Sequence, residues 1–453
     1  MFKKWFKIYF LFAALVMLAL TGCKKWLDVD VPLQVDQSTV YSNEQGFREV
    51  LNGVYLQMGS RSLYGRDMTF GLMSVFGRSY DTTISPAIGN LYYEGARYNF
   101  NDAAVKTTFK NIWDSLYQCI GNLNNLLTNV ESNKSVFTGN NYNTIKGEAI
   151  GLRAFIHFDL LRMFAASPAA AGLGATGIPY VTKMSPYGVA VSTTGAVIDS
   201  CVADLLVAQA LLSDADLTTS KFTSWGVKGL LARIYMYKGD LAKAQAQALA
   251  IINSNKFPLS VNNSDLMFTK ENLFSLFSSF NISLQYYKSV LNTNPPLAFS
   301  RPNQTALFVT GGGATTDWRN SFIDPATGAF NITLEKNISP RKFYATTANV
   351  LPMIRLTEMY YIAAECATAN LDSLTATNLL DTVRVHRNVP KYVVAALKTD
   401  SLNVEIRKEY QKELLGEGQM FYFYKRKNLP FSSLPFTKVQ VVANASYVFV
   451  KPE

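Results

Sequence analysis

The chain contains 453 residues, of which 48% are hydrophobic and 17% are charged. This balance excludes a largely disordered protein and favours a compact exported protein with a sizeable core. The formal net charge of +10 is spread thinly along the chain, and no nucleic-acid-binding motif accompanies it, so we expect no nucleic-acid partner.

The N-terminal residues have the features of an export signal. Three lysines precede an apolar segment over residues 8–20, and the segment ends in the sequence Leu-Thr-Gly-Cys at 20–23. Basic, apolar and small residues in this order are typical of a signal peptide, and the closing cysteine is typical of a lipoprotein. The segment is short for a membrane-spanning helix and a polar sequence follows it. We therefore predict that residues 1–22 are removed and that Cys23 carries the lipid.

Residues 23–40 are expected to form a tether, in which Pro32 disfavours a helix before it. Beyond the tether, apolar residues recur with helical periodicity over most of the chain. Periodicity and capping residues predict nine helices, over 43–58, 105–130, 142–164, 194–212, 223–238, 240–253, 356–370, 372–388 and 401–415.

Two helical hairpins, over 223–254 and 356–388, share one pattern of small residues. The shared positions are Ala232, Asp240 and Ala244 in the first hairpin and Ala364, Asp372 and Ala376 in the second. Small residues at these intervals are typical of tetratricopeptide repeats, although an arbitrary antiparallel helix pair would also tolerate them. The predicted fold class is mainly α, a tetratricopeptide-like α-α superhelix with long irregular loops and little β structure.

Two long stretches, 59–102 and 257–350, lack the helical pattern, and loops of this length are usually functional. Both are rich in aromatic residues, whose flat faces suit the CH-rich faces of sugar rings. The alternative is that most of these side chains pack beneath the loops. The predicted ligand-binding residues are Tyr92, Tyr93, Tyr98, Asn101, Tyr286, Tyr287 and Trp318.

The sequence offers little to support catalysis. His157 lies in an apolar helical run and is expected to be packed and hydrogen-bonded, and His386 is expected at the surface near a helix end. Glu405, Glu409 and Glu413 are spaced four apart among basic residues, which is typical of a solvated helix face. We therefore expect no enzyme activity, and a surface glycoside hydrolase is the weakest alternative.

Three cysteines remain after Cys23, namely Cys119, Cys201 and Cys366. They are far apart in apolar stretches, so buried free thiols are expected. With two histidines and no close Cys/His cluster, we expect no metal and no cofactor.

Several segments carry a resemblance to a known family. They are 23–28 (CKKWLD), 112–124 (IWDSLYQCIGNLN), 147–155 (GEAIGLRAF), 158–162 (FDLLR), 177–180 (GIPY), 230–240 (LLARIYMYKGD) and 354–365 (IRLTEMYYIAAE). Together they resemble the SusD/RagB family of outer-membrane nutrient-binding lipoproteins. The resemblance covers nearly the whole chain.

This resemblance implies one SusD-like domain over 23–453, anchored in the outer membrane by the lipid on Cys23 and facing outward from a Gram-negative cell. It implies an oligosaccharide ligand and a SusC-like TonB-dependent transporter as partner, which the protein would cover as a hinged lid without chemical turnover. Some relatives bind peptides, so a peptide-binding lid is one alternative, and a scaffold lipoprotein without a small ligand is another.

The C-terminal signature of this family is only partly present. Glu409, Glu413, Glu417 and Arg426 match it. Tyr410 and Met420 stand where it has arginines, and Phe423 stands where it has aspartate. We therefore expect apolar packing in place of a local ion-pair network. The D-x-R element at 317–319 resembles a recurrent family element whose Asp and Arg look structural.

Overall fold

A computed structural model describes residues 37–80, 90–185, 187–291, 297, 299–308, 316–325, 337–340, 342–343, 349–435 and 439–452. The predicted signal peptide, Cys23 and most of the predicted tether lie outside these residues. The last residues of the tether form a short helix, α2 (Gln37–Val40).

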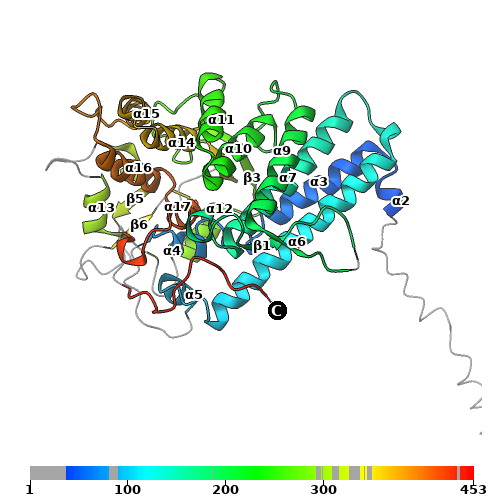
Figure 1. Cartoon of the computed structure of the whole chain (residues 1–453), viewed down its shortest axis with the longest axis horizontal. Coiled ribbons are helices and arrows are strands. Elements are labelled where there is room, and N and C mark those ends of the chain that lie inside the picture. Colours follow the sequence, from blue (N-terminus) through cyan, green and yellow to red (C-terminus); the bar gives the residue numbers. More distant parts are fainter. Residues whose placement is uncertain are drawn as a thin grey trace, which may run out of the picture.

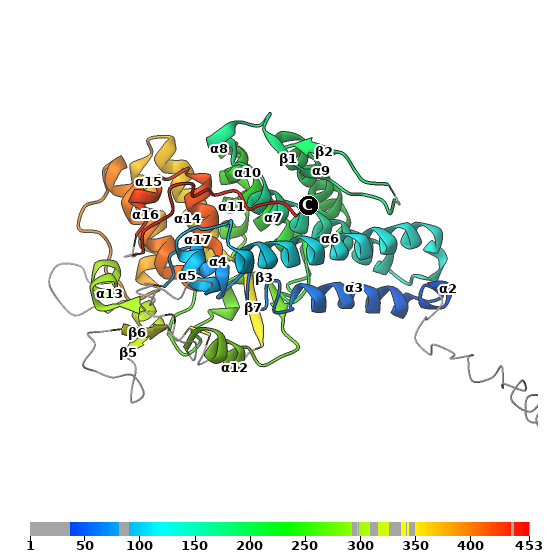
Figure 2. The ribbon, with the colours of Figure 1, turned by 90° about the horizontal axis from the view of Figure 1, so that it is seen from below.

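In the described part of the chain, nine long helices form the body of the molecule, and each packs against the next one in the array. They are α3 (Glu44–Met58), α6 (Ala103–Ser132), α7 (Asn141–Phe164), α9 (Thr194–Leu211), α10 (Ser224–Lys238), α11 (Leu241–Asn253), α14 (Leu356–Ala369), α15 (Ser373–Val385) and α16 (Thr399–Glu413). The pair α3 and α6 lies at one end and the group α14 to α16 at the other (Figures 1 and 2). All nine predicted helices are confirmed, with ends within three residues of the prediction.

The β structure of the described residues consists of three small antiparallel sheets. They pair β1 (Thr176–Pro179) with β2 (Val191–Thr193), β3 (Asn272–Phe277) with β7 (Val350–Arg355), and β6 (Asn337–Pro340) with both β4 (Phe299–Ser300) and β5 (Ile323–Pro325). Short helices complete the described structure: α4 (Leu72–Phe76), α5 (Leu91–Ala96), α8 (Pro168–Ala171), α12 (Ile282–Tyr286), α13 (Arg301–Phe308), α17 (Gln419–Arg426), the 3₁₀ turns Lys134–Val136, Thr269–Glu271, Trp318–Phe322 and Phe431–Ser433, and the π turn Tyr287–Leu291.

The two predicted hairpins are present as α10 with α11 and α14 with α15. Their four shared alanines are fully buried, which lets the helix backbones approach closely. Gly239 ends α10 with a φ of 91°, a left-handed conformation that glycine adopts without a steric penalty. Asp240 then caps α11 by accepting a hydrogen bond from the Lys243 amide at 3.2 Å. The helical repeat prediction is therefore confirmed.

Replacing Asp240 with alanine removes the N-cap acceptor of α11, so we expect a loss of about 1 kcal/mol in the free energy of unfolding. Urea denaturation measures this loss. Asp199→Ala is the control, because that side chain is mostly exposed and pairs with Lys238 at the surface. The control should change stability by less than about 0.5 kcal/mol. Equal losses in both variants would contradict the capping role.

Helix α7 is the central element, and every residue from 147 to 164 is buried. Helix α9 packs against it through a stripe of buried residues that includes Val197, Cys201 and Leu205. Within the described part of the chain, α9 is the one helix long and apolar enough to pass a composition test for a membrane span. Of the window that passes this test, 39% is buried inside the protein, where α9 packs against α7.

The stretch 59–102 is less irregular than predicted. It contains α4 and α5, and α4 packs against both α5 and α17. Every residue from 63 to 80 except Arg66 is buried, because this segment is densely apolar and folds into the core. In the second stretch, 257–350, β3 pairs with β7 and thereby ties part of the region to the helical body.

Candidate ligand surface and a buried ionic network

Two of the predicted residues, Tyr92 and Tyr93, lie together on α5. The side chain of Asn90 starts this helix by accepting hydrogen bonds from their amides at 3.0 and 3.2 Å. Both rings are partly exposed. The guanidinium carbon of Arg97 lies 5.4 Å from the ring centroid of Tyr93, a cation–π contact that supports the ring.

Tyr92 lies beside an ion pair that the sequence prediction did not include. Arg66 donates to both carboxylate oxygens of Asp67, at 2.6 and 3.1 Å. Burial, and then the charge of Asp67, raise the pKa of Tyr92 to about 12, so its hydroxyl stays protonated. A half-buried ring beside a guanidinium and a carboxylate offers an apolar face together with hydrogen-bond donors and acceptors. The sequence feature that could have identified this ion pair is the adjacent Arg66 and Asp67 within an otherwise apolar stretch.

Tyr98 is a core residue and not part of an exposed surface, which corrects its assignment to the ligand-binding set. It is 1% exposed, and its hydroxyl donates to the Phe76 carbonyl oxygen. Its ring packs edge-on against Phe431 with centroids 4.8 Å apart. The Tyr98 ring is buried because many aromatic side chains surround this segment. The residue type alone does not predict this burial.

The remaining predicted residues separate into different environments. Tyr286 is also buried, against Phe70 at 5.2 Å between centroids, and so leaves the predicted surface. Tyr287, one residue further, is 40% exposed. Asn101 is exposed just before α6, and Trp318 is partly buried, with its amide donating to the Arg387 carbonyl oxygen. The seven predicted residues therefore do not form one continuous site, and α5 is the part that combines aromatic and polar groups.

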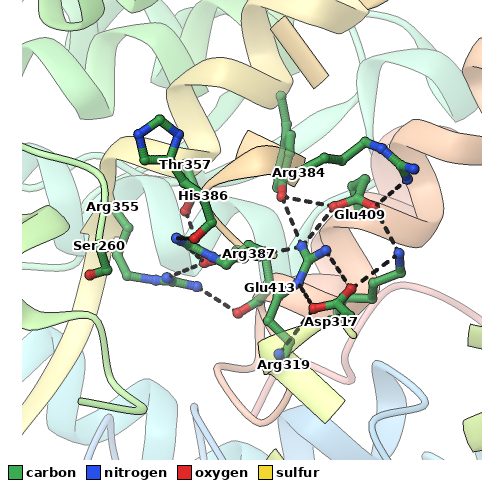
Figure 3. Close-up of polar contacts among 12 residues, drawn as sticks. Ser260, Asp317, Arg319, Arg355, Thr357, Arg384, His386, Arg387, Glu409 and Glu413 are labelled. Atoms are coloured by element: carbon green, nitrogen blue, oxygen red, sulfur yellow. Dashed lines mark hydrogen bonds and ion pairs between the residues drawn. The ribbon is translucent and has the colours of Figure 1, made fainter. Parts of the chain in front are cut away.

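A buried ionic network connects the second stretch, residues 257–350, with the helical body (Figure 3). Its main members are Glu271, Asp317, Arg319, Lys342, Arg355, Arg387, Glu409, Lys412, Glu413 and Glu417. At its centre, Glu413 accepts hydrogen bonds from Arg355 at 2.7 Å and from Arg387 at 2.8 Å. Both oxygens of this carboxylate are used, because Arg387 and Arg319 also reach the second oxygen at 3.1 and 3.3 Å.

Glu409 extends the network along α16. It accepts from Arg319 at 2.7 Å and from Lys412 at 2.8 Å. Burial alone raises the pKa of Glu409, but the charges of Arg319 and Lys412 outweigh burial and lower the pKa to about 2. In the same way, Arg387 and Arg355 outweigh burial and hold the pKa of Glu413 well below its ordinary value. Both carboxylates are ionised at neutral pH.

This network overturns one expectation. Glu409 and Glu413 are fully buried and do not belong to a solvated helix face. At the substituted positions beside the network, apolar packing is present as expected. Tyr410 packs there against Phe423 with ring centroids 5.0 Å apart. Helical spacing of charges is the same on a solvated face and on a face buried against cations, so periodicity could not separate the two cases.

The network joins the second stretch to the helical body. Arg319 and Lys342 come from this stretch, and their acceptors Glu409, Glu413 and Glu417 come from α16 and the turn after it. Asp317 holds Arg319 through two hydrogen bonds, at 2.9 and 2.8 Å. The D-x-R element is thus structural, as the family resemblance implied, and it fixes the backbone on either side of Trp318.

The two histidines are hydrogen-bonded to backbone groups, and the three cysteines are buried. His157 is buried, with Nδ1 2.9 Å from the Arg153 carbonyl oxygen and Nε2 accepting from the Val181 amide at 2.9 Å. Burial lowers the pKa of His157 to about 3, so the ring is neutral. His386 is partly exposed at the end of α15. Cys119, Cys201 and Cys366 are buried free thiols, as predicted. Among the described residues, no group of three or more His, Cys, Asp or Glu side chains is placed to hold a metal ion.

The fold and this surface define a class of protein: a tetratricopeptide-like helical scaffold that carries non-repetitive loop regions on its body. The model of a family described as "Starch-binding associating with outer membrane" matches residues 25–236, and the model of the SusD family matches residues 311–433. Two curated relatives from Formosa agariphila, SusD-like protein P2 and SusD-like protein P25, are 25% and 21% identical over 259 and 252 residues. These matches cover 55% and 54% of this chain and 46% of each relative, so the chain spans about half the length of the curated relatives it matches.

Solved structures share the same fold. A SusD superfamily protein from Bacteroides thetaiotaomicron superposes with a TM-score of 0.72 at 22% identity, covering 85% of this chain and 89% of that one. A SusD-like carbohydrate binding protein from Bacteroides vulgatus gives a TM-score of 0.70 at 20% identity, covering 85% of this chain and 83% of that one. On the matches of the two family models, over residues 25–236 and 311–433, the chain belongs to the SusD/RagB family.

Proposed function

We propose that this protein is a cell-surface lipoprotein that binds oligosaccharides at the surface formed by α5 and the Arg66–Asp67 pair. Family membership supports a glycan ligand. The observation that carries the proposal for this chain is the position of Tyr92 and Tyr93, partly exposed on one short helix, with guanidinium groups of Arg66 and Arg97 beside them. Rings and charged hydrogen-bonding groups in one place suit a ligand with CH faces and many hydroxyls.

In this proposal the protein acts as a hinged lid for a TonB-dependent outer-membrane transporter. The lipid on Cys23 keeps the protein at the outer membrane, and the helical repeats provide the docking surface. Ligand held between lid and transporter favours the closed state, since it contacts both partners only there. The ligand is transferred without chemical turnover.

The ligand surface is tested by replacing Tyr93 with alanine. Loss of a partly exposed ring that stacks on a sugar should weaken binding by about 1 to 3 kcal/mol, the range typical of an interface truncation. Isothermal titration against a panel of oligosaccharides measures the affinity. Tyr187→Ala removes an 81% exposed tyrosine from the loop after β1 and should leave the affinity unchanged.

Unchanged affinity in Tyr93→Ala would remove α5 from the ligand surface. If the wild-type protein binds peptides and no oligosaccharide, it is a peptide-binding lid. If it binds neither but co-purifies with a transporter, it is a scaffold lipoprotein.

A further inference from the structure

The two arginines of the α5 surface are each paired with a carboxylate that is more deeply buried than the arginine. The side chains of Arg66 and Arg97 are each 33% exposed. The side chains of their partners, Asp67 and Glu94, are 6% and 4% exposed. In both pairs the group that a ligand can reach is therefore the guanidinium, because the protein covers the carboxylate.

Arg97 has hydrogen-bond donors that are available to a ligand. Its Nη1 lies 3.5 Å from Glu94 Oε2, which accepts its hydrogen bond from the Asn99 side chain at 2.8 Å instead. Within the described residues, the guanidinium nitrogens of Arg97 form this ion pair and no hydrogen bond. They are not among the buried unpaired nitrogens, unlike Nε and Nη2 of Arg78, so they are open to solvent.

Arg66 keeps one nitrogen available on the same surface. Its Nε and Nη2 donate to Asp67, whereas Nη1 forms no hydrogen bond within the described residues and is not among the buried unpaired atoms. The hydrogen bonds to Asp67 raise the pKa of Arg66 above its ordinary value, so this guanidinium stays charged. The guanidinium of Arg97 is charged as well, because arginine does not lose its proton in proteins.

The charge of the whole chain has the same sign as this surface. The formal net charge is +10, and it stays positive when the three lysines of the predicted signal peptide are removed. A net positive charge attracts anionic ligands over a distance and raises their association rate. Close to α5, the carboxylate of Asp102 is used as the N-cap of α6 and accepts from the Ala104 and Val105 amides.

We propose that the α5 surface selects anionic oligosaccharides, with a carboxylate or sulfate group of the sugar at Arg97, a second contact at Arg66, and sugar rings on Tyr92 and Tyr93. Both kinds of oxyanion offer oxygen atoms that accept parallel hydrogen bonds from a planar guanidinium. This inference rests on the proposed glycan-binding function and narrows its ligand class from oligosaccharides in general to those that carry an oxyanion.

The experiment compares three oligosaccharides that differ at one unit, which is glucose, glucuronate or glucose 6-sulfate. Isothermal titration of the intact protein at low ionic strength should show at least one anionic ligand binding about 10-fold more tightly than the neutral one, as for a charge-assisted hydrogen bond. The ligand with the larger gain identifies the oxyanion. The preference should fall as the ionic strength rises, because salt screens charges at an exposed site.

Arg97→Gln should remove most of this preference and change the affinity for the neutral ligand much less. Lys243→Gln is the matched control, since Lys243 pairs with Asp240 at 3.1 Å and lies 5.5 Å from the ring centroid of Tyr235. It therefore removes one positive charge from a similar arrangement, on α11 at the opposite side of the molecule from α5 (Figure 1). The control should keep the preference. Circular dichroism checks that both variants are folded.

Each contrary result has a defined meaning. Equal affinity for all three ligands, or a preference that persists in a folded Arg97→Gln variant, overturns the selection of anionic sugars at α5 and leaves the proposed function standing. A preference that falls equally in Lys243→Gln reflects only the net charge of the protein and also overturns the inference. Binding of none of the three ligands, with silence across the wider oligosaccharide panel, overturns the proposed function as well.

A second measurement applies if Arg97→Gln does not fold. A crystal structure of the wild-type protein with the tighter anionic ligand should place the oxyanion within hydrogen-bond distance of the Arg97 guanidinium. An oxyanion bound elsewhere overturns the inference.

Discussion

Replacing Glu413 with glutamine is expected to lower the free energy of unfolding by about 3 to 5 kcal/mol. This is the typical cost of removing one charged partner from a buried ion pair. Glutamine keeps the shape but removes the charge, and Arg319, Arg355 and Arg387 would then share less negative charge in a site without water access. The amide group of glutamine would also direct donors toward these guanidinium groups. Chemical denaturation followed by circular dichroism measures the loss.

Glu405→Gln provides the control on the same helix. Glu405 is two turns before Glu413, is 20% exposed and pairs with Lys408 at 3.1 Å. A partly exposed pair of this kind contributes less than about 1 kcal/mol. A similar cost for both substitutions would show that the buried network does not carry the stability assigned to it. A large loss in Glu413→Gln alone would confirm that the network holds the second stretch to the helical body.

The second large effect is a loss of stability in acid. The pKa of Glu409 is lowered from 4.5 to about 2 in the folded protein, so the unfolded chain binds a proton at a higher pH than the folded one. The stabilisation is therefore complete above about pH 4.5 and is lost as the pH falls toward 2. This single carboxyl accounts for about 3 kcal/mol over that window. Glu413, whose pKa is lowered in the same direction, adds to the slope.

Urea unfolding at a series of pH values between 5 and 2 measures the slope. A Glu409→Gln variant should be less stable than wild type at neutral pH and should show a shallower loss in acid, because glutamine does not titrate. Glu405→Gln should keep the wild-type slope. If the slope in Glu409→Gln equals that of wild type, the acid sensitivity arises outside the network.

The local sequence predicts the helices correctly, but it does not predict whether charged and aromatic side chains are buried or exposed. The nine helices depend on periodicity and caps such as Asp240, which act within a few residues. The position of Tyr98 and Tyr286 in non-periodic stretches predicts a surface location, yet both are buried. The packing partner that decides this for Tyr98 is Phe431, more than three hundred residues away in the chain.

The predicted export signal, the repeat hairpins and the family resemblance depend on residues close together in the sequence, and they can be inferred from it. Burial of Glu409 and Glu413 depends on Arg319 and Arg355, which reach α16 from distant segments. Whether a charge is solvated or paired is decided by such long-range packing, since desolvation and Coulomb energies depend on three-dimensional surroundings and not on sequence spacing.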